Sequence, residues 1–299
     1  MSVLAGRKVV LSISDAPDRG RLGFPDREID RTVYSVCIAL IRAGASILYS
    51  GDLRPEGFTF KIFRHLAGAY AGAGHVPFVH LVPEPVFRRT PFETWHKMML
   101  EIRGTTTSQI VIGSKPLAMV LTEEGKGLLI DPDGDGRIEI NSADEFSAWL
   151  AKIPVPLPQA AYSVARDVGT SMADARIALG GKMGLADDAN DQYEGVMPGI
   201  AEEVLLALRA GKPVVCLGAF GGATRDIAIE LGLLPLEARI PRGPQRPDYE
   251  PAIKEVGKFK GNIPEALKPR LAAIADDDHT EQLANVVVDV LSEWLARRT

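Results

Sequence analysis

Two glycines and a lysine follow a short apolar run in the segment ARIALGGKMG (175–184). Because Gly180 and Gly181 carry no Cβ, backbone amides at this point can approach a phosphate closely, and Lys182 would place a positive charge beside it. The segment is not a Walker motif, since it lacks the preceding glycine spacing and the following Ser or Thr. An ordinary turn with a solvated lysine explains the same residues equally well.

Two adjacent carboxylates lie further along, in the segment VMPGIAEEVLLAL (196–208). Pro198 predicts the start of a helix, and an acidic first turn stabilises a helix without any ligand. Neighbouring helix residues point about 100° apart, so Glu202 and Glu203 cannot both face the sheet. One of them can accept hydrogen bonds from ribose hydroxyls while the other remains a capping charge. Acidic first turns are common without a ligand, so these residues alone favour a structural role, and it is their position beside the glycine loop that favours a ligand.

Polar loops follow two predicted strands near the amino end, SISDAPDRGRLG (12–23) and SGDLRPEGFT (50–59). Parallel strands bring their carboxyl ends to one edge of a sheet, so both loops should meet there. Arg54 either pairs with a phosphate or bridges to Asp52 or Asp18, and Thr59 either contacts a ligand or only caps a helix. The candidate ligand-binding residues of these two loops are Ser14, Asp18, Gly51, Asp52, Arg54 and Thr59.

A further glycine loop opens a predicted helix in GAFGGATRDIAIELG (218–232). It repeats the design of the 175–184 segment, in which a buried strand ends in glycines before a helix. The candidates from the glycine loops and the PGIAEE turn are Arg176, Gly180, Gly181, Lys182, Gly199, Glu202, Glu203, Gly218, Phe220, Gly221 and Gly222.

The acidic turn DPDGDGRIEINSADEF (131–146) matches the start of a calcium-binding loop. Its twelfth position is Ser142 rather than a bidentate glutamate, and Asp/Gly-rich turns are common without a metal. A calcium ion held in the 131–145 loop and a plain turn both remain open, and no other cofactor is expected. The candidate calcium ligands are Asp131, Asp133, Asp135 and Glu139.

Composition limits the classes of function. The 299 residues carry a net charge of -5, which leaves no basic excess for binding a nucleic-acid polymer. Cys37 and Cys216 lie in apolar segments without a CxxC partner, and the five histidines lack ligand spacing. The initial apolar stretch is too short for a signal peptide, and no run of about 18 apolar residues occurs, so we expect a cytoplasmic protein without a membrane partner.

The elements that must position these residues alternate between strand and helix. Apolar runs predict strands at 8–13, 45–50, 75–83, 176–179 and 213–218, and helical spacing predicts helices at 27–42, 58–70, 160–172 and from Pro198 to near Gly211. A proline-rich linker leads to an amphipathic helix at the C-terminus, which packs on its own core or forms a dimer seam. This alternation predicts an α/β fold with a Rossmann-like, doubly wound, mostly parallel sheet.

Residues 84–160 break this rhythm and predict an irregular insertion, with strands at IVIG and AMVLT that lack clear crossover helices. We expect residues 1–299 to form one domain that contains the insertion.

The runs SISDAPDRGRLG, GDLRPEGFT, ADARIALGGKMG, GVMPGIAEE and GAFGGATRDIA resemble the SLOG superfamily, a Rossmann-like fold related to LOG phosphoribohydrolases and DprA. The similarity covers roughly residues 7–83 and 160–235. It is greatest to the prokaryotic branch related to the cytoplasmic domains of melastatin-type TRP channels and to the SLOG sensor of the Thoeris antiphage effector.

In that branch the resemblance implies binding of ADP-ribose or a cyclic isomer, with Arg176, Lys182 and Glu202 or Glu203 at the ligand. In the LOG enzymes the corresponding motif, PGGxGTxxE, serves hydrolysis of an N-glycosidic bond. The resemblance makes Glu203 the match to their glutamate and places Arg166 near their arginine. Here LGGK replaces the start of that motif, and a long acidic loop separates it from MPGIAEE.

Two functions therefore follow as expectations. The first is a non-catalytic sensor of a nucleotide-derived molecule, acting in antiphage defence through a separate effector protein and assembling as a homo-oligomer. The second is a nucleotide N-glycosidase or a related nucleoside transferase, in which Glu203 and Arg166 are catalytic.

Overall fold

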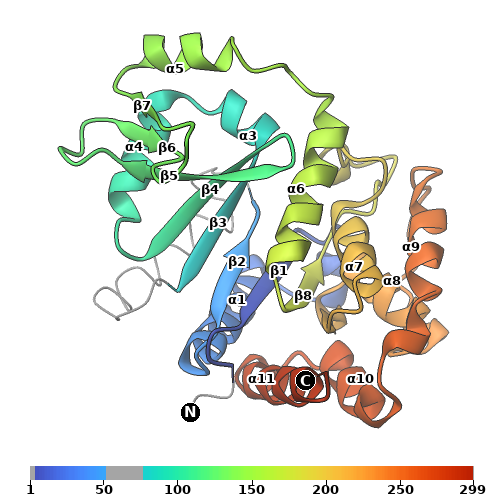
Figure 1. The fold of residues 1–299 in the computed structure, drawn as a ribbon. Coiled ribbons are helices and arrows are strands. Elements are labelled where there is room, and N and C mark those ends of the chain that lie inside the picture. Colours follow the sequence, from blue (N-terminus) through green and yellow to red (C-terminus); the bar gives the residue numbers. More distant parts are fainter. Residues whose placement is uncertain (1–3, 52–76, 299) are drawn as a thin grey trace. The chain divides into compact units, whose positions relative to one another are not determined.

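The computed structural model describes residues 4–51 and 77–298 (Figure 1). The chain divides into two compact units. The first comprises Met1–Ile47 and Thr170–Thr299, and the second comprises Leu48–Gly169. Among the described residues, nine strands form one sheet in the order β7-β6-β5-β4-β3-β2-β1-β8-β9. The protein is thus an α/β protein with a mostly parallel sheet flanked by helices, as the strand and helix alternation predicts.

The first unit is built on parallel strands. Strand β1 (Lys8–Ser14) pairs in parallel with β8 (Ala175–Gly180), which pairs in parallel with β9 (Val214–Leu217). Each residue of β8 and β9 is buried, which explains their nearly continuous apolar sequences. Strand β2 (Ser46–Tyr49) lies at the boundary of the two units along the chain. All four strands occur where apolar runs predict them.

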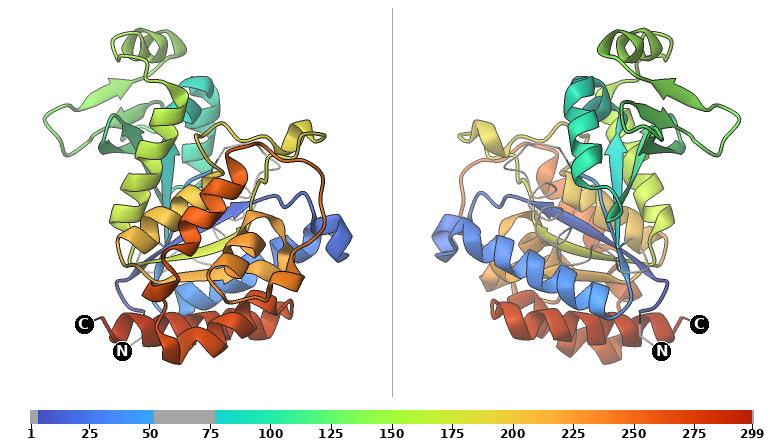
Figure 2. Two further views of the ribbon diagram at one scale, coloured as in Figure 1. Left: turned by 90° about the vertical axis from the view of Figure 1, so that its right-hand side faces the viewer. Right: turned by 90° about the vertical axis from the view of Figure 1, so that its left-hand side faces the viewer.

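Helices cover the strands of the first unit. Helix α7 (Gly199–Arg209) contacts β1, β8 and β9, and α8 (Gly222–Glu230) contacts β8 and β9. Helix α1 (Asp26–Arg42) lies along α11 (Thr280–Ala296), as the blue and red ribbons of Figure 2 show. The apolar stripe of α11 is buried in its own unit, with the Thr280 hydroxyl hydrogen-bonded to that of Thr32. Helix α11 therefore packs on its own core.

The linker interpretation for the region after α8 is wrong. Two helices lie there, α9 (Tyr249–Gly257) and α10 (Lys268–Asp276). Tyr249, Ala252, Ile253 and Val256 are all buried and recur at helical spacing. The prolines fall before α9, between α9 and α10, and in the first turns of the two helices, where proline is compatible with helical structure.

The second unit departs from the strand and helix rhythm. Strand β3 (Phe78–Pro83) pairs in parallel with β4 (Thr106–Ile112). Strands β5 (Lys115–Leu121), β6 (Leu128–Ile130) and β7 (Ile138–Ile140) then continue as antiparallel neighbours. Helix α5 (Ala143–Leu150) follows, and α6 (Pro158–Met172) leads out of the unit.

The expectation that the strands of residues 84–160 lack crossover helices is wrong for β4. Helices α3 (Glu84–Arg89) and α4 (Phe92–Glu101) connect β3 to the parallel strand β4. The buried residues of α4 are Phe92, Trp95, Met98 and Met99, again at helical spacing. Several prolines around this short segment hide that pattern in the sequence.

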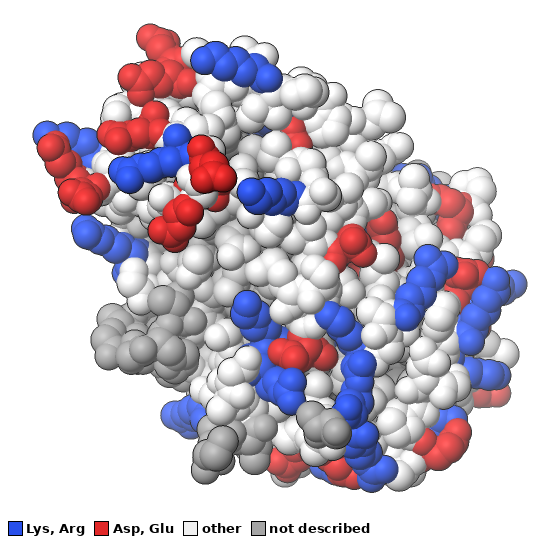
Figure 3. Space-filling model, in the orientation of Figure 1, with Lys and Arg blue, Asp and Glu red and all other residues white. Residues whose placement is uncertain are grey.

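Charges of both signs are interspersed among the described residues on the face drawn in Figure 3. The acidic residues responsible for the net charge of -5 therefore do not form a single acidic patch on that face. Within residues 4–51 and 77–298, none of the helices has the length and apolar character needed to cross a membrane.

Candidate functional site

A buried group of polar side chains lies between the sheet of the first unit and α7. Arg176 donates through Nη1 to Glu203 Oε2 at 2.8 Å and through Nη2 to Thr170 Oγ1 at 2.9 Å. The same Nη1 donates to the Ser12 hydroxyl, which in turn donates to Glu203 Oε2. The side chains of Arg176 and Glu203 are 2% and 16% exposed. Arg176 and Glu203, two of the predicted site residues, thus form a largely buried ion pair.

Strand register explains how these side chains meet. In the parallel pair of β1 and β8, Ser12 lies opposite Ala178 and Ser14 opposite Gly180. Residues two apart on a strand share a face, so Ser12 and Ser14 both point toward the side that carries Arg176. At about 3.3 Å per residue, Ser14 is about 7 Å nearer the carboxyl edge than Ser12. The ion pair therefore lies beneath the loops at that edge rather than among them.

Glycine permits a close meeting of three loops at the carboxyl edge. Gly180 has φ +68°, and a Cβ there would lie 2.1 Å from the Ser14 carbonyl oxygen. Gly222, with φ +68°, would place a Cβ 2.6 Å from the carbonyl carbon of Gly180, and a Cβ on Gly181 would press against Ala223 at 3.0 Å. The loops after β1, β8 and β9 are thus in backbone contact, as the glycine pattern predicts.

Asp18 occupies the amino end of α8. Its Oδ1 accepts a hydrogen bond from the Gly222 amide at 2.7 Å, and the residue is 4% exposed. Burial raises the pKa of the Asp18 carboxyl above its ordinary value, although the Gly222 amide acts in the opposite direction. This carboxylate fills the position at which a helix N-terminus would otherwise accept an anion. Asp18 therefore serves the fold at α8 in this structure.

Lys182 belongs to a loop, residues 181–193, that is tied together by polar contacts. Asp191 is 3% exposed, and its carboxylate accepts from the amides of Met183 and Leu185. Lys182 Nζ donates to the Gln192 carbonyl oxygen at 2.7 Å. The lysine is thus held near the glycines, at the edge where α7 begins.

Other predicted residues lie around this edge or below it. Gly199 is the first residue of α7, and Glu202 is buried in the first turn of that helix. Phe220 is fully buried and packs on Phe24, with ring centroids 5.1 Å apart. A Cβ on Gly218 would lie 2.9 Å from the Ala275 carbonyl oxygen. Phe220 and Gly218 therefore serve packing in this structure, whereas Gly199 opens α7 at the edge.

Some predicted residues belong to the second unit. The Gly51 carbonyl lies 3.5 Å from His80 Nε2 within that unit. Arg166, on α6, places its guanidinium 5.8 Å from the centroid of the Tyr162 ring. Asp52, Arg54 and Thr59 lie outside the described residues.

Sequence reasoning missed three residues that complete the site. Ser12 lies between Arg176 and Glu203, Thr170 holds the other end of the guanidinium, and Asp191 organises the Lys182 loop. A signal for Ser12 exists in the sequence, since it alternates with Ser14 along an otherwise apolar strand. No comparable signal marks Thr170 or Asp191.

The acidic turn of the second unit borders a cavity of about 1060 Å³. Asp133 and Glu139 line this cavity, whereas Asp131 adopts φ 54° and its carboxylate lies where a Cβ on Gly134 would fall. Among the described residues, these carboxylates do not form a group with ligand atoms within 4.8 Å of one another. Calcium binding by Asp131, Asp133, Asp135 and Glu139 stays a prediction that titration with Ca²⁺ tests.

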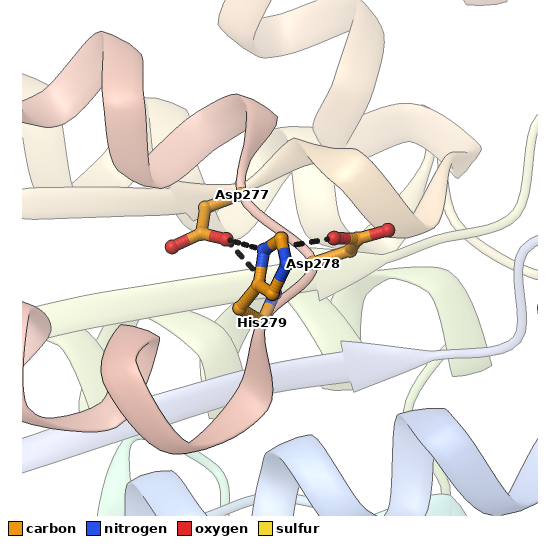
Figure 4. A group of neighbouring side chains, drawn as sticks. All are labelled: Asp277, Asp278 and His279. Atoms are coloured by element: carbon orange, nitrogen blue, oxygen red, sulfur yellow. Dashed lines mark hydrogen bonds and ion pairs between the residues drawn. The ribbon is translucent and has the colours of Figure 1, made fainter.

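Asp277, Asp278 and His279 do form such a group, at the turn between α10 and α11 (Figure 4). His279 Nδ1 lies 2.9 Å from Asp277 Oδ1 and 3.3 Å from Asp278 Oδ1. The His279 amide also donates to Asp277 Oδ1, and His279 directly precedes α11. These contacts explain the group as a helix-starting turn, and we assign it no ligand.

Comparison of the chain with protein families shows which family it belongs to. The model of the family described as SLOG cluster2 matches residues 3–266, which include the whole β1, β8, α7 and α8 region. Neither a search of the curated proteins nor one of the solved structures found a match. The chain therefore belongs to the SLOG cluster2 family, and membership implies a nucleotide-related binding or glycosidase-like function.

Proposed function

We propose that the chain binds a nucleotide-derived ligand of the ADP-ribose or cyclic ADP-ribose type at the carboxyl edge of β1 and β8 in the first unit. The observation that carries the proposal is the meeting of the Gly180–Gly181 turn, Lys182 and the start of α7 at this edge. Ligands of open α/β sheets bind outside the carboxyl ends of the strands.

The phosphates of such a ligand would lie against the amino end of α7 and near Lys182. A Cβ on Gly181 would be 3.0 Å from Ile200 Cδ1, so the first turn of α7 directly adjoins the glycine turn. The positive end of the α7 dipole and the Lys182 ammonium would then share the negative charge. The corresponding end of α8 already carries the Asp18 carboxylate, which favours α7 over α8.

The ribose would lie over the buried ion pair. Glu203 is the carboxylate of the PGIAEE turn that faces the sheet, where Ser12 and Arg176 bind the same oxygen. The Glu203 side chain is 16% exposed, whereas that of Arg176 is 2% exposed, so Glu203 is the member of the pair that a ligand can reach. In this proposal Glu203 accepts a ribose hydroxyl, and Arg176 fixes the orientation of Glu203.

A thermal-shift screen tests the proposal. The ligands are ADP-ribose, its cyclic isomers, NAD and AMP, because a ligand that binds only the folded chain raises its melting temperature by mass action. We expect ADP-ribose or a cyclic isomer to give the largest shift. The absence of stabilisation by any of them at millimolar concentration would remove the proposal.

A second candidate is cleavage of an N-glycosidic bond. The observation that favours it is that Glu203 is held by an arginine and a serine, as a carboxylate that stabilises an oxocarbenium-like centre would need to be. Incubation with nucleoside monophosphates and NAD, followed by chromatography for free base, separates the two functions. Base release that is lost in Glu203→Ala would support the enzyme, and tight binding without release supports the sensor.

The wider role follows from the same proposal. The resemblance to the Thoeris sensor and to the TRP channel domains supports a signal-binding part of an antiphage system, located in the cytoplasm. A sensor of this kind requires a partner that reads the bound state, and we propose a separate effector protein together with self-association of the chain.

A further inference from the structure

A short segment after α8 pairs with the Lys182 loop. This segment, residues 242–248 (RGPQRPD), is called the strap. The Arg246 amide donates to the Gly184 carbonyl at 2.8 Å, and the Ala186 amide donates to the Pro244 carbonyl at 2.9 Å. Leu185 and Gln245 form an isolated antiparallel bridge. The strap thus continues the loop as a small two-stranded pairing, although the two segments are about 60 residues apart in the chain.

Arg246 joins the strap to the end of the loop. Its Nη1 donates to the Tyr193 carbonyl at 2.7 Å, and its guanidinium lies 4.0 Å from the centroid of the Tyr193 ring. The same guanidinium binds both oxygens of Asp248, and the Tyr193 hydroxyl donates to Asp248 Oδ1 at 2.9 Å. Arg246 therefore fixes the residue that follows Gln192, whose carbonyl holds Lys182.

The other end of the strap is fixed to α8. Arg242 binds Asp226 through Nη1 at 3.0 Å and Nη2 at 2.6 Å, and the Tyr249 hydroxyl donates to Asp226 Oδ2 at 2.6 Å. Asp226 is 1% exposed, so these contacts are buried. Gly222, at the start of α8, lies against Gly180. The strap therefore connects the Lys182 loop to α8, and α8 in turn contacts the glycine turn that precedes Lys182.

We propose that the strap positions the Lys182 loop for ligand binding, with Arg246 as a positioning residue. The inference rests on the proposed function and adds a residue that no motif marks. Without Arg246, the end of the loop would move, and a ligand would have to order it again on binding. Binding and loop order are reciprocal, so a bound ligand should also slow hydrogen exchange of the strap amides.

Titration calorimetry with ADP-ribose and its cyclic isomers, together with hydrogen-exchange mass spectrometry, tests this inference. In Arg246→Ala we expect Kd to rise about tenfold, the cost of ordering one or two loop residues. Exchange of the 183–193 amides should become faster. Arg246→Lys keeps a positively charged donor group, so its Kd and its loop exchange should lie between those of the wild type and Arg246→Ala. This partial recovery would show that the effects of Arg246→Ala come from the lost contacts and not from general unfolding.

Arg270→Ala is the matched control. Arg270 forms an ion pair with Glu293 and is 41% exposed, against 34% for Arg246. Its removal should leave Kd and loop exchange unchanged. If the wild type binds and Arg246→Ala binds with the same Kd, this inference alone is overturned. A wild type that binds neither ADP-ribose nor its cyclic isomers would remove the proposed function as well.

Discussion

Arg176 is surrounded by oxygen atoms of Ser12, Thr170 and Glu203, which come from three different elements, β1, α6 and α7. A guanidinium has a rigid fork of donors, so this arrangement fixes the Glu203 carboxylate in direction as well as in charge. That is the property a carboxylate needs if it is to recognise one ribose geometry. The Arg176–Glu203 ion pair therefore has two roles: it stabilises the first unit, and it orients a carboxylate of the proposed ligand site.

Arg176→Ala should destabilise the chain by about 3 kcal/mol, because it leaves the largely buried Glu203 carboxylate without its cation. Denaturant unfolding measures the loss. Arg209→Ala is the control, since Arg209 pairs with Glu255 at 52% and 31% exposure. Exposed pairs contribute less than about 1 kcal/mol. Equal losses in the two variants would contradict the account of Arg176 as a buried anchor.

Asp18 gives stability a pH dependence. Burial raises its pKa in the folded chain, so the folded state binds this proton more tightly than the unfolded state. Its contribution to stability is therefore complete below about pH 4 and is lost as the pH rises through the raised pKa. Burial also raises the pKa of Asp191, which acts in the same direction.

Asp18→Asn should flatten the fall in unfolding free energy above about pH 4, because the amide oxygen still accepts from Gly222 while the titrating group is gone. Denaturant unfolding at several pH values from 4 to 7 measures the slope. Asp191 should leave a residual slope in the variant. If unfolding free energy fell with pH as steeply in Asp18→Asn as in the wild type, the Asp18 pKa would be the same in the folded and unfolded chains, and the prediction would be wrong.

At the scale of elements, the glycine turn after β8 decides how closely the site loops approach. Gly180→Ala would require φ +68° from an alanine and a Cβ 2.1 Å from the Ser14 carbonyl. Gly232 is a matched control, with φ +73° and open space around its missing Cβ. Gly232→Ala should cost about 1–2 kcal/mol from the left-handed conformation alone. Gly180→Ala should cost about 1–3 kcal/mol more and should abolish nucleotide binding.

Denaturant unfolding and a nucleotide titration on both variants measure these differences. If Gly180→Ala were as stable as Gly232→Ala and still bound its ligand, the loops would not need to meet as closely as the structure shows.

Several elements can be predicted from sequence because each has a pattern of its own. Strands β1 and β8 are apolar runs interrupted by Ser12 and Arg176, and α7 has both a starting proline and a helical stripe. Helices α4, α9 and α10 have helical spacing too, yet prolines at their boundaries favour a loop interpretation. The contacts of Arg176 depend on strand register, which one strand's sequence does not contain.

At the scale of the whole molecule, the two compact units divide the predicted residues. The charged cluster, the glycine turns and Lys182 belong to the first unit, whereas the acidic turn with Asp133 and Glu139 belongs to the second. The sequence predicts two strands in residues 84–160, at IVIG and AMVLT, which correspond to β4 and β5. It does not reveal the two further strands that this stretch adds to the sheet. Short strands of three residues, such as β6 and β7, give too little alternation to be recognised.

Self-association is a prediction for the whole chain. Helix α11 buries its apolar stripe within the first unit, so an oligomer would have to use another surface. Light scattering coupled to gel filtration should give a mass of at least two chains, each of 32.2 kDa. A single species at the mass of one chain, at micromolar concentration and with ADP-ribose present, would contradict it.

We propose above all that the carboxyl edge of the first unit binds an ADP-ribose-like ligand through Lys182. Titration calorimetry of ADP-ribose and its cyclic isomers into the wild type, Lys182→Ala and the control Lys126→Ala tests it most directly. Lys126 is an exposed lysine of the second unit that pairs with Glu124. We predict saturable binding to the wild type and to Lys126→Ala, and a Kd at least about tenfold higher for Lys182→Ala, the loss of one charge-assisted contact. No binding by the wild type, or equal affinity in all three proteins, would contradict the account.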